Sequence, residues 1–510
     1  MKKKWKSLIA ILIIAAIALT GCGAGGSKEE EKKNDAQGTA SPEEKSPLRD
    51  GKMTELRVVF PGNASSPASL EAVQEGINEI LSQYMDATVK LDIQEWGVFA
   101  DQQSLMLSSG EDVALMFTYL GTKNYAANGQ AKDITDLCNT YAADGLKLIS
   151  QYIDACKVND KIYGFPTFHE YSSRKGLICR TDILEELGVD PAQVKTWDDV
   201  EAIFKQVKQK HPEMNVLCPA DATSGVFGYM ISSKYDELTG GVVTLMDSDG
   251  KTVVNLYDTD MYKDFAKMAY EWNAKGYVMP DATTATETRQ EYLAAGNCFG
   301  YIGGIHPGTA TQELKNSGIK VTTISIEEPI LITSAVNFAQ YMVPSSCSTP
   351  EKAVKLLDLM ITNKDINNLM MYGVEGTDYV VKDEANNIIG YPDGVDSSSV
   401  GWSNETWLVG NGSLGYIWES DPPTIWEQYK ELNESSTPSP LFGFSYDTEK
   451  VKTEITAVTN VISKYRLVIQ AGYADPDKTV ASMVSELQAA GIQKIIDDAQ
   501  AQVDQWYSSK

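Results

Sequence analysis

The chain contains few of the residues on which most metal and catalytic sites depend. Only three histidines occur in 510 residues, His169, His211 and His306, and their spacing is not that of metal ligands. The sequence also lacks a P-loop, a glycine-rich dinucleotide motif, a Gly-x-Ser-x-Gly motif and a His-Glu-x-x-His motif. We therefore expect no bound metal, no cofactor and no enzymatic activity.

Paired cysteines are also missing. Beyond Cys22 the chain has six cysteines, and none of them forms a Cys-x-x-Cys pair. A chain of this length does not need disulfide bonds for stability, and several of these cysteines adjoin apolar residues. We expect buried thiols that are mostly reduced, with at most one bridge. The six are Cys138, Cys156, Cys179, Cys218, Cys298 and Cys347.

Positive charge is scarce. The chain has 44 Lys and Arg against 70 Asp and Glu, a formal net charge of −26. Proteins that bind nucleic acids, or membranes through polybasic patches, carry the opposite balance. The sequence therefore predicts no nucleic-acid partner. An acidic, well-solvated surface is the simpler interpretation, and a preference for cationic ligands is the alternative.

No apolar run is long enough to span a bilayer, which takes about 20 residues. Residues 8–19 form an apolar run of 12 residues after four lysines, and small residues then lead to Cys22. This pattern resembles the signal segment of a bacterial lipoprotein, in which the cysteine is lipidated. We expect a signal peptide at 1–21, lipidation at Cys22, and a flexible tether at 22–52, which is polar and has no aromatic residue.

The first part of the body has the pattern of an α/β domain. Apolar, β-branched segments at 56–60, 89–93 and 113–117 predict strands, and amphipathic segments at 70–84 and 102–107 predict helices. This alternation implies a parallel sheet with right-handed crossovers. In such sheets ligands bind beyond the carboxyl ends of the strands.

A second unit follows, and the chain ends in helices. Strands are predicted at 176–180 and 299–302, and the helices that accompany them at 181–187, 197–207, 262–272 and 288–295. A strong helix is expected at 351–361. Residues 450–506 read as mostly helical, with a break at 472–476 where glycine and proline occur.

Aromatic residues are abundant outside the predicted helix faces. The chain has 9 tryptophans and 25 tyrosines, and many stand in turns or at strand ends. Sugars stack their C–H faces on such rings, while amide and carboxylate groups bind their hydroxyls. Core packing is the alternative for any single ring. Together these aromatic residues favour an amphipathic ligand.

Several segments, in this order, resemble the extracellular solute-binding proteins of ABC importers, in the family 1 group that includes the maltose-binding type. Residues 110–117 are similar to the early part of that group, residues 161–166 with 177–184 to the first passage between lobes, and residues 299–304 to a loop facing the cleft. Residues 372–379, Tyr-Gly-Val-Glu-Gly-Thr-Asp-Tyr, are similar to a signature of the larger members. Residues 443–507 resemble a helical C-terminal domain of unassigned function found in that subgroup.

The resemblance implies a two-lobed, type II periplasmic-binding-protein fold, in which each lobe is a mostly parallel sheet flanked by helices. We assign 53–168 and about 334–380 to the first lobe, 169–333 and about 381–442 to the second, and 443–507 to a helical segment packed on the lobes. Passages between lobes are expected near 166–176, 328–338 and 376–402. A ligand would bridge both lobes and favour their closure.

The resemblance further implies a lipid-anchored, monomeric binding protein on the extracytoplasmic face of a bacterial membrane, which passes an oligosaccharide to ABC permease subunits. The predicted ligand-binding residues combine stacking rings with groups that bind hydroxyls. They are Trp96, Tyr119, Glu170, Tyr171, Tyr301, Glu375, Trp402, Trp407 and Asn411, with Asn63 and Thr118 at strand ends.

Three alternatives remain open at the level of sequence. A peptide or polyamine ligand would suit the acidic charge. A surface-anchored glycoside hydrolase would need two facing carboxylates about 5–10 Å apart, and the many acidic residues never exclude such a pair. A sensor that presents a bound sugar to a membrane receptor would have the same sequence features as a transport protein.

Overall fold

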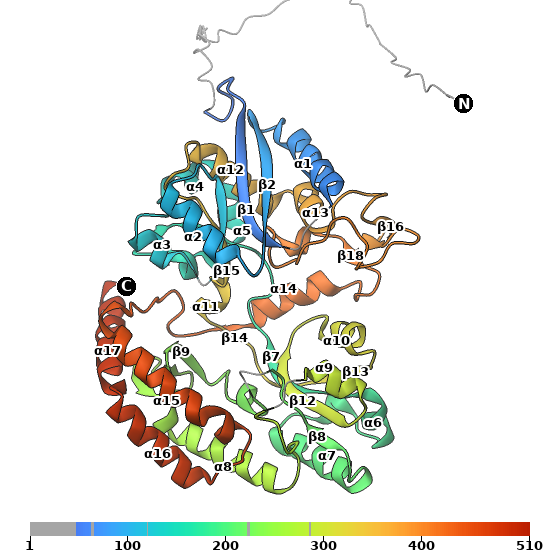
Figure 1. The fold of residues 1–510 in the computed structure, drawn as a ribbon, viewed down its shortest axis with the longest axis vertical. Helices are drawn as coiled ribbons and strands as arrows, with labels where there is room; N and C mark the ends of the chain where they lie inside the picture. The colour runs from blue at the N-terminus through green and yellow to red at the C-terminus, as the bar shows by residue number, and fades with distance from the viewer. Residues whose placement is uncertain (1–46, 63–65, 120, 222–224, 285–286) are drawn as a thin grey trace, which may run out of the picture. The chain divides into compact units, whose positions relative to one another are not determined.

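The structure, a computed structural model, describes residues 47–62, 66–119, 121–221, 225–284 and 287–510 (Figure 1). Cys22, the signal segment, most of the predicted tether and Asn63 lie outside the described residues. Within the described part of the chain, none of the helices combines the length and apolar character that crossing a bilayer requires.

The first lobe is built on a five-stranded sheet with the order β2-β1-β3-β15-β6. Strand β1 (Thr54–Gly62) pairs in parallel with β2 (Ala87–Glu95) and β3 (Leu115–Tyr119). The two remaining strands, β15 (Ala339–Met342) and β6 (Gly164–Pro166), are antiparallel to their neighbours. The three predicted strands of this lobe are thus present, each longer or shifted by about two residues.

For helix α1 (Pro67–Leu81), the sequence predicts the buried face correctly but places both ends three residues too late. The predicted apolar face is buried at Val73, Ile77 and Leu81, which recur every four residues. The helix begins three residues before the predicted start, because Pro67 fits the first turn and the Ser66 side chain accepts a hydrogen bond from the backbone N–H of Ser69.

Further helices accompany the first sheet, among them α2 (Phe99–Ser109), which contains the predicted helix at 102–107. Helix α13 packs beside α1, and α12 packs against α4 and α5 (Figure 1). The predicted helix at 351–361 is almost entirely buried in this lobe, which explains its strong apolar pattern. The bounds are α4 (Thr135–Tyr141), α5 (Ala143–Leu148), α12 (Pro350–Thr362) and α13 (Lys364–Tyr372).

The second lobe has a four-stranded sheet with the order β13-β7-β12-β8. Strand β12 (Cys298–Ile305) is parallel to β8 (Asn215–Leu217), whereas β7 (Arg174–Arg180) is antiparallel to both β12 and β13 (Val321–Glu327). This sheet is therefore less parallel than expected. The reason is that β7 starts at the edge of the sheet at which β8 and β12 end.

Helices of the second lobe begin where the sequence predicts. Helix α7 (Trp197–Lys210) starts with a capping box, in which Thr196 and Asp199 each bind the other's backbone N–H. Helices α8 (Asp260–Ala274) and α9 (Arg289–Ala294) also match their predicted positions.

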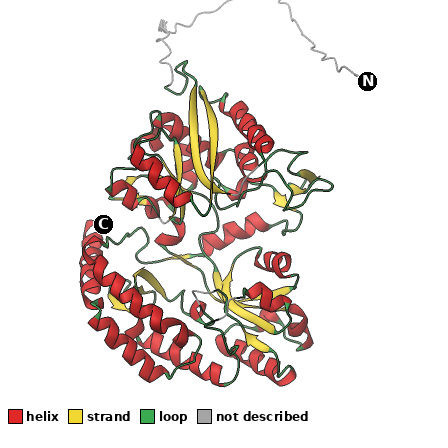
Figure 2. Cartoon of the chain, viewed as in Figure 1, coloured by secondary structure: helices red, strands yellow, loops and turns green. Residues whose placement is uncertain are grey.

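The C-terminal segment is helical, as Figure 2 shows. It consists of α15 (Lys452–Gln470), α16 (Pro476–Ala489) and α17 (Ile492–Ser509), with the predicted break between the first two. Both α15 and α16 pack against α8. Their buried residues belong to the same hydrophobic core as the second sheet; they include Val458, Ile462, Val480, Met483 and Leu487.

The buried side chains form two hydrophobic cores, and these correct one predicted boundary. Residues 381–442 were expected in the second lobe, with a passage near 376–402. Instead Ile389, Trp402 and Leu408 are buried in the first core, and the chain joins the second core only near Leu441. The apolar residues of 389–409 pack on the first lobe. The third passage of the chain between the lobes therefore comes later in the sequence than predicted. The other predicted lobe boundaries remain predictions.

All six cysteines in the described part of the chain are buried and unpaired. Burial raises the pKa of Cys138 to about 12 and that of Cys347 to about 11, because the thiolate loses its hydration. These thiols are packing residues, as the sequence predicts.

Candidate functional site

The edge of the first sheet where β1, β2 and β3 end gathers aromatic side chains from four segments. Trp96 follows β2 directly, and Tyr119 is the last residue of β3. Phe338 precedes β15, which is antiparallel to β3 and therefore starts at the same edge. Trp407 comes from residues 391–411, a long loop after β17 (Ile388–Gly390) whose buried side chains belong to the first core.

These four residues form what we call the aromatic wall. The ring centroid of Trp407 lies 5.9 Å from Trp96, 6.4 Å from Tyr119 and 5.8 Å from Phe338. Trp96 and Phe338 are each 40% exposed. Ring faces left open to water are uncommon for such large apolar side chains, and they favour a stacked ligand.

Buried groups behind the aromatic wall fix the positions of its rings. Phe117, fully buried on β3, packs against Tyr119 at 4.9 Å and against Trp407 at 6.3 Å between ring centroids. The hydroxyl of Thr167 donates a hydrogen bond to the carbonyl oxygen of Trp407 at 2.7 Å. The position of Trp407 is thus fixed from both its ring and its backbone, so the wall needs little ordering when a ligand binds.

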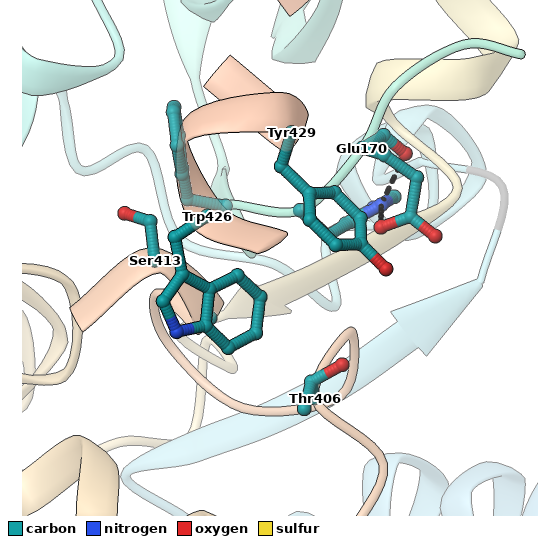
Figure 3. Close-up of a pocket in the computed structure, with 8 residues that line it drawn as sticks. Glu170, Thr406, Ser413, Trp426 and Tyr429 are labelled. Atoms are coloured by element: carbon teal, nitrogen blue, oxygen red, sulfur yellow. Dashed lines mark hydrogen bonds and ion pairs between the residues drawn. The ribbon is translucent and has the colours of Figure 1, made fainter. Parts of the chain in front are cut away.

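A small pocket, partly open to solvent, is formed by residues that follow β6, by residues 406–413 and by α14 (Ile425–Ser435) (Figure 3). Trp426 and Tyr429 supply two of its walls, and their ring centroids are 5.4 Å apart. The indole N–H of Trp426 donates to the carbonyl oxygen of Gly415, so only the ring face remains for a ligand. The other lining residues are Phe168, His169, Glu170, Thr406, Gly412 and Ser413.

The polar groups of this pocket suit a ligand with hydroxyl groups. Burial, together with the charge of Glu170, raises the pKa of Tyr429, so its phenol stays protonated and can donate. Burial lowers the pKa of His169, so its ring is neutral, and Nδ1 lies 2.6 Å from the carbonyl oxygen of Glu170. Nδ1 therefore carries the proton, and Nε2 is an acceptor that has no partner among the described residues.

The structure brings some predicted residues together. Trp96, Tyr119 and Trp407 meet in the aromatic wall, and Glu170 lines the pocket. Asn411 is adjacent to the pocket in sequence, but it is only 1% exposed, and its amide binds the carbonyl oxygen of Ile361 and caps the turn at Ser413. Asn411 shapes the loop that carries Gly412 and Ser413.

Three other predicted residues are committed to packing. Trp402 is 2% exposed and donates its indole N–H to the carbonyl oxygen of Met370. Tyr171 is equally buried, and its hydroxyl donates to the carbonyl oxygen of Thr167. Thr118 is fully buried beside Tyr119. The predicted ligand contacts of these side chains find no support in their positions.

Two predicted residues lie apart from the aromatic wall and the pocket. Tyr301, on β12 in the second core, is 3% exposed, and its hydroxyl donates to Glu313. Glu375 is exposed in the turn after α13, where its backbone bridges to that of Tyr379. Their role in binding stays a prediction.

The sequence analysis missed Phe338, Thr406, Ser413, Trp426 and Tyr429. Trp426 and Tyr429 are three residues apart, which places both rings on one face of a helix. That spacing was a usable signal. Phe338 carried none, because only the antiparallel pairing of β15 with β3 brings it to the wall. In the described residues no three His, Cys, Asp or Glu side chains gather as metal ligands would.

Two α/β lobes joined by several passages, with an open aromatic site at a sheet edge, define a class of proteins: the type II solute-binding proteins. The chain belongs to the bacterial extracellular solute-binding protein family, whose model matches residues 77–380. A second model, a domain of unknown function (DUF3502), matches residues 440–508, which confirms the resemblance of residues 443–507.

Similar proteins support this assignment. A carbohydrate ABC transporter substrate-binding protein of Streptococcus pneumoniae serotype 4 is 26% identical over 470 residues, covering 87% of this chain and 89% of that protein. An arabinooligosaccharide-binding protein of Bacillus subtilis strain 168 is 26% identical over 191 residues, covering 36% of this chain and 43% of that protein.

Solved structures confirm the predicted fold class. The crystal structure of an N-glycan transport solute binding protein from Streptococcus pneumoniae matches with a TM-score of 0.77 at 22% identity, covering 89% of this chain and 98% of that chain. An extracellular solute-binding protein from Bifidobacterium longum subsp. infantis matches with a TM-score of 0.60 at 14% identity, covering 90% of this chain and 99% of that chain.

Proposed function

We propose that this protein is the substrate-binding component of an ABC importer and captures an oligosaccharide. The aromatic wall is the observation that carries the proposal. Four rings from separate segments converge at a sheet edge, and two of them leave 40% of their surface open to water. Such a surface suits the apolar faces of successive sugar rings.

The pocket beside α14 supplies the polar half of this recognition. A protonated phenol at Tyr429, the carboxylate of Glu170 and the hydroxyls of Thr406 and Ser413 can bind sugar hydroxyls as donors and acceptors. Rings and hydrogen-bonding groups together fit a carbohydrate better than a peptide or a polyamine. The S. pneumoniae relative, described as a carbohydrate ABC transporter substrate-binding protein, supports the same choice.

Binding of an oligosaccharide accounts for both the aromatic wall and the pocket, so we propose no catalytic step. The ligand would bridge the two lobes, favour their closure, and be handed to the permease in the closed form. We further propose that a lipid on Cys22 holds a monomeric protein at the extracytoplasmic face of the membrane. Membership of an extracellular family supports that location. The tether then ends before Leu48 rather than at residue 52 as predicted, because Leu48 is buried in the first core and Asp50 pairs with Lys352.

Isothermal titration of residues 46–510 against oligosaccharides, peptides and polyamines tests the proposal. These residues form one compact unit, so the body can be produced without its lipid anchor. We expect tight, saturable binding of one sugar class and no release of smaller sugars on long incubation. Binding of only a peptide or polyamine would overturn the carbohydrate assignment, and sugar release would favour a glycoside hydrolase.

Lipidation is tested separately. The full-length chain expressed in a bacterium should fractionate with membranes and acquire the mass of a diacylglyceryl group at Cys22. Cys22→Ala should abolish both the added mass and membrane retention. Retention of that variant on membranes would overturn the anchor.

A further inference from the structure

In the part of the chain that the structure describes, the second sheet presents a cationic side chain without an acidic partner. Lys175 is the second residue of β7, at the end of the sheet where β8 and β12 finish. It is half-buried, and its Nζ lies 2.6 Å from the hydroxyl of Ser173 and 5.6 Å from the centre of the Tyr229 ring. Within the described residues, no carboxylate forms an ion pair with it.

Other buried lysines in the described chain, unlike Lys175, have a carboxylate as counter-ion. Lys352 pairs with Asp50, and Lys355 pairs with Asp358. An ammonium group that is removed from water without a partner is costly. Burial lowers the pKa of Lys175 to about 8, and no acidic residue counteracts this effect. An anion placed beside Nζ would remove the penalty.

The charged groups around Lys175 are engaged elsewhere. Glu327, opposite Lys175 on β13, forms an ion pair with Lys234 and accepts the indole N–H of Trp197. Arg174 points to the other face of the sheet, and its nearest carboxylate is Glu328 at 3.9 Å. The hydroxyl of Tyr229 donates to Asp221. No neighbour of Lys175 offers it a free carboxylate.

The neighbour of Lys175 on β12 carries no side chain. Its partner across the sheet is Gly304. A Cβ at Gly304 would lie 3.0 Å from the Ser173 hydroxyl and 3.9 Å from the Lys175 Nζ, so both polar groups pack closely over the bare backbone of Gly304. Glu170 of the pocket precedes Lys175 by five residues, which places their Cα atoms within about 18 Å of each other. One oligosaccharide can therefore contact both.

We propose that the ligand is an acidic oligosaccharide, and that Lys175 binds its carboxylate. The inference rests on the proposed function and narrows it, since it names the chemical class of the sugar. The ammonium group would donate to the carboxylate while keeping its bond to Ser173, because lysine has three donors. The net negative charge of the chain does not oppose this, because a local ion pair outweighs distant, screened charges.

Matched pairs of oligosaccharides that differ only in charge test the proposal. Suitable probes are tetragalacturonate with its methyl ester, and a sialylated N-acetyllactosamine tetrasaccharide with the same chain after removal of sialic acid. We expect the acidic member of a bound pair to bind at least tenfold more tightly in titration calorimetry. Equal affinity for both members would overturn the proposal.

Variants of Lys175 provide the second readout. Lys175→Met should reduce the ratio of acidic to neutral affinity to about one, whereas Lys175→Arg should keep most of it. Lys205→Met, an exposed lysine on α7 without an ion pair in the described chain, is the matched control and should leave the ratio unchanged. A preference that survives in Lys175→Met would overturn the role of this residue.

The failures of the two proposals are distinguishable. Tight binding of neutral sugars without a preference for acidic ones would overturn the acidic ligand and leave the carbohydrate-binding function intact. If no sugar binds, both the acidic ligand and the carbohydrate-binding function are overturned. Circular dichroism and thermal melting of Lys175→Met exclude loss of fold as the cause of a lost preference.

Discussion

At the scale of single residues, identical side chains have different roles in this protein. Trp402 and Trp407 are five positions apart in one loop, yet the first is buried in the core and the second completes the aromatic wall. The sequence treats them alike, because both stand among polar and glycine residues. The hydrogen bond from the Trp402 indole N–H to the carbonyl oxygen of Met370 is a tertiary contact, and no local sequence pattern predicts it.

Trp96→Ala should weaken oligosaccharide binding about fivefold to tenfold, because it removes one stacking ring, worth about 1 kcal/mol. Thermal stability should hardly change, since the ring is 40% exposed. Titration calorimetry measures the affinity. Tyr270→Ala, an exposed ring on α8, is the matched control. Unchanged affinity in Trp96→Ala would remove this residue from the site.

Asp236 provides a pH-dependent prediction. It is 6% exposed, and burial raises its pKa above the usual value of 3.8, although the Ser439 hydroxyl donates to it. The folded state therefore binds the proton more tightly than the unfolded state, so this group costs stability as pH rises from about 4 through its raised pKa.

Asp236→Asn should remove that cost and flatten the pH dependence of unfolding in this window, with equal or higher stability at pH 7. Urea unfolding at several pH values measures it. Asp247→Asn, on the same lobe with no resolved partner in the described residues, serves for comparison. A loss of stability in Asp236→Asn at pH 7 would show that the charged form is favoured.

At the scale of elements, helix starts follow local chemistry. Helix α7 begins at a complete capping box, while α12 begins after Thr349, whose side chain makes no capping bond. Both helices have threonine at the cap, and the sequence distinguishes them only by the acidic residue three positions later in α7.

Thr196→Ala should therefore destabilise the protein by about 1 kcal/mol, a fall of roughly 2–4 °C in the melting temperature of its lobe. Thr349→Ala should have a clearly smaller effect. Differential scanning calorimetry compares the two. Equal losses in both variants would mean that the capping bonds do not decide the stability of α7.

At the scale of the whole molecule, the C-terminal helices are part of the second lobe. Their apolar faces lie in the same core as the second sheet, and Tyr473 ties them to the Met279 carbonyl. A segment that shares a core with a lobe should unfold together with it.

Met483→Ala, at a fully buried site on α16, should cost about 2–5 kcal/mol and lower protection from hydrogen exchange in both the C-terminal helices and the second sheet. Ser482→Ala, exposed on the same helix, should change neither. Loss of protection confined to 452–509 would instead show that this segment folds as a separate unit.

The sequence by itself determined the class of fold, most helices and strands, the C-terminal helical segment and the family, because periodic burial and ordered motifs are local signals. The antiparallel strands of the second sheet depended on how β7 pairs with β12 and β13, and the late third passage depended on which core Ile389 and Leu408 enter. Phe338 joined the aromatic wall only through strand pairing. Among the described residues Lys175 has no counter-ion, because Glu327 pairs with Lys234 instead. Contacts between distant residues decide these features, and only the tertiary structure contains them.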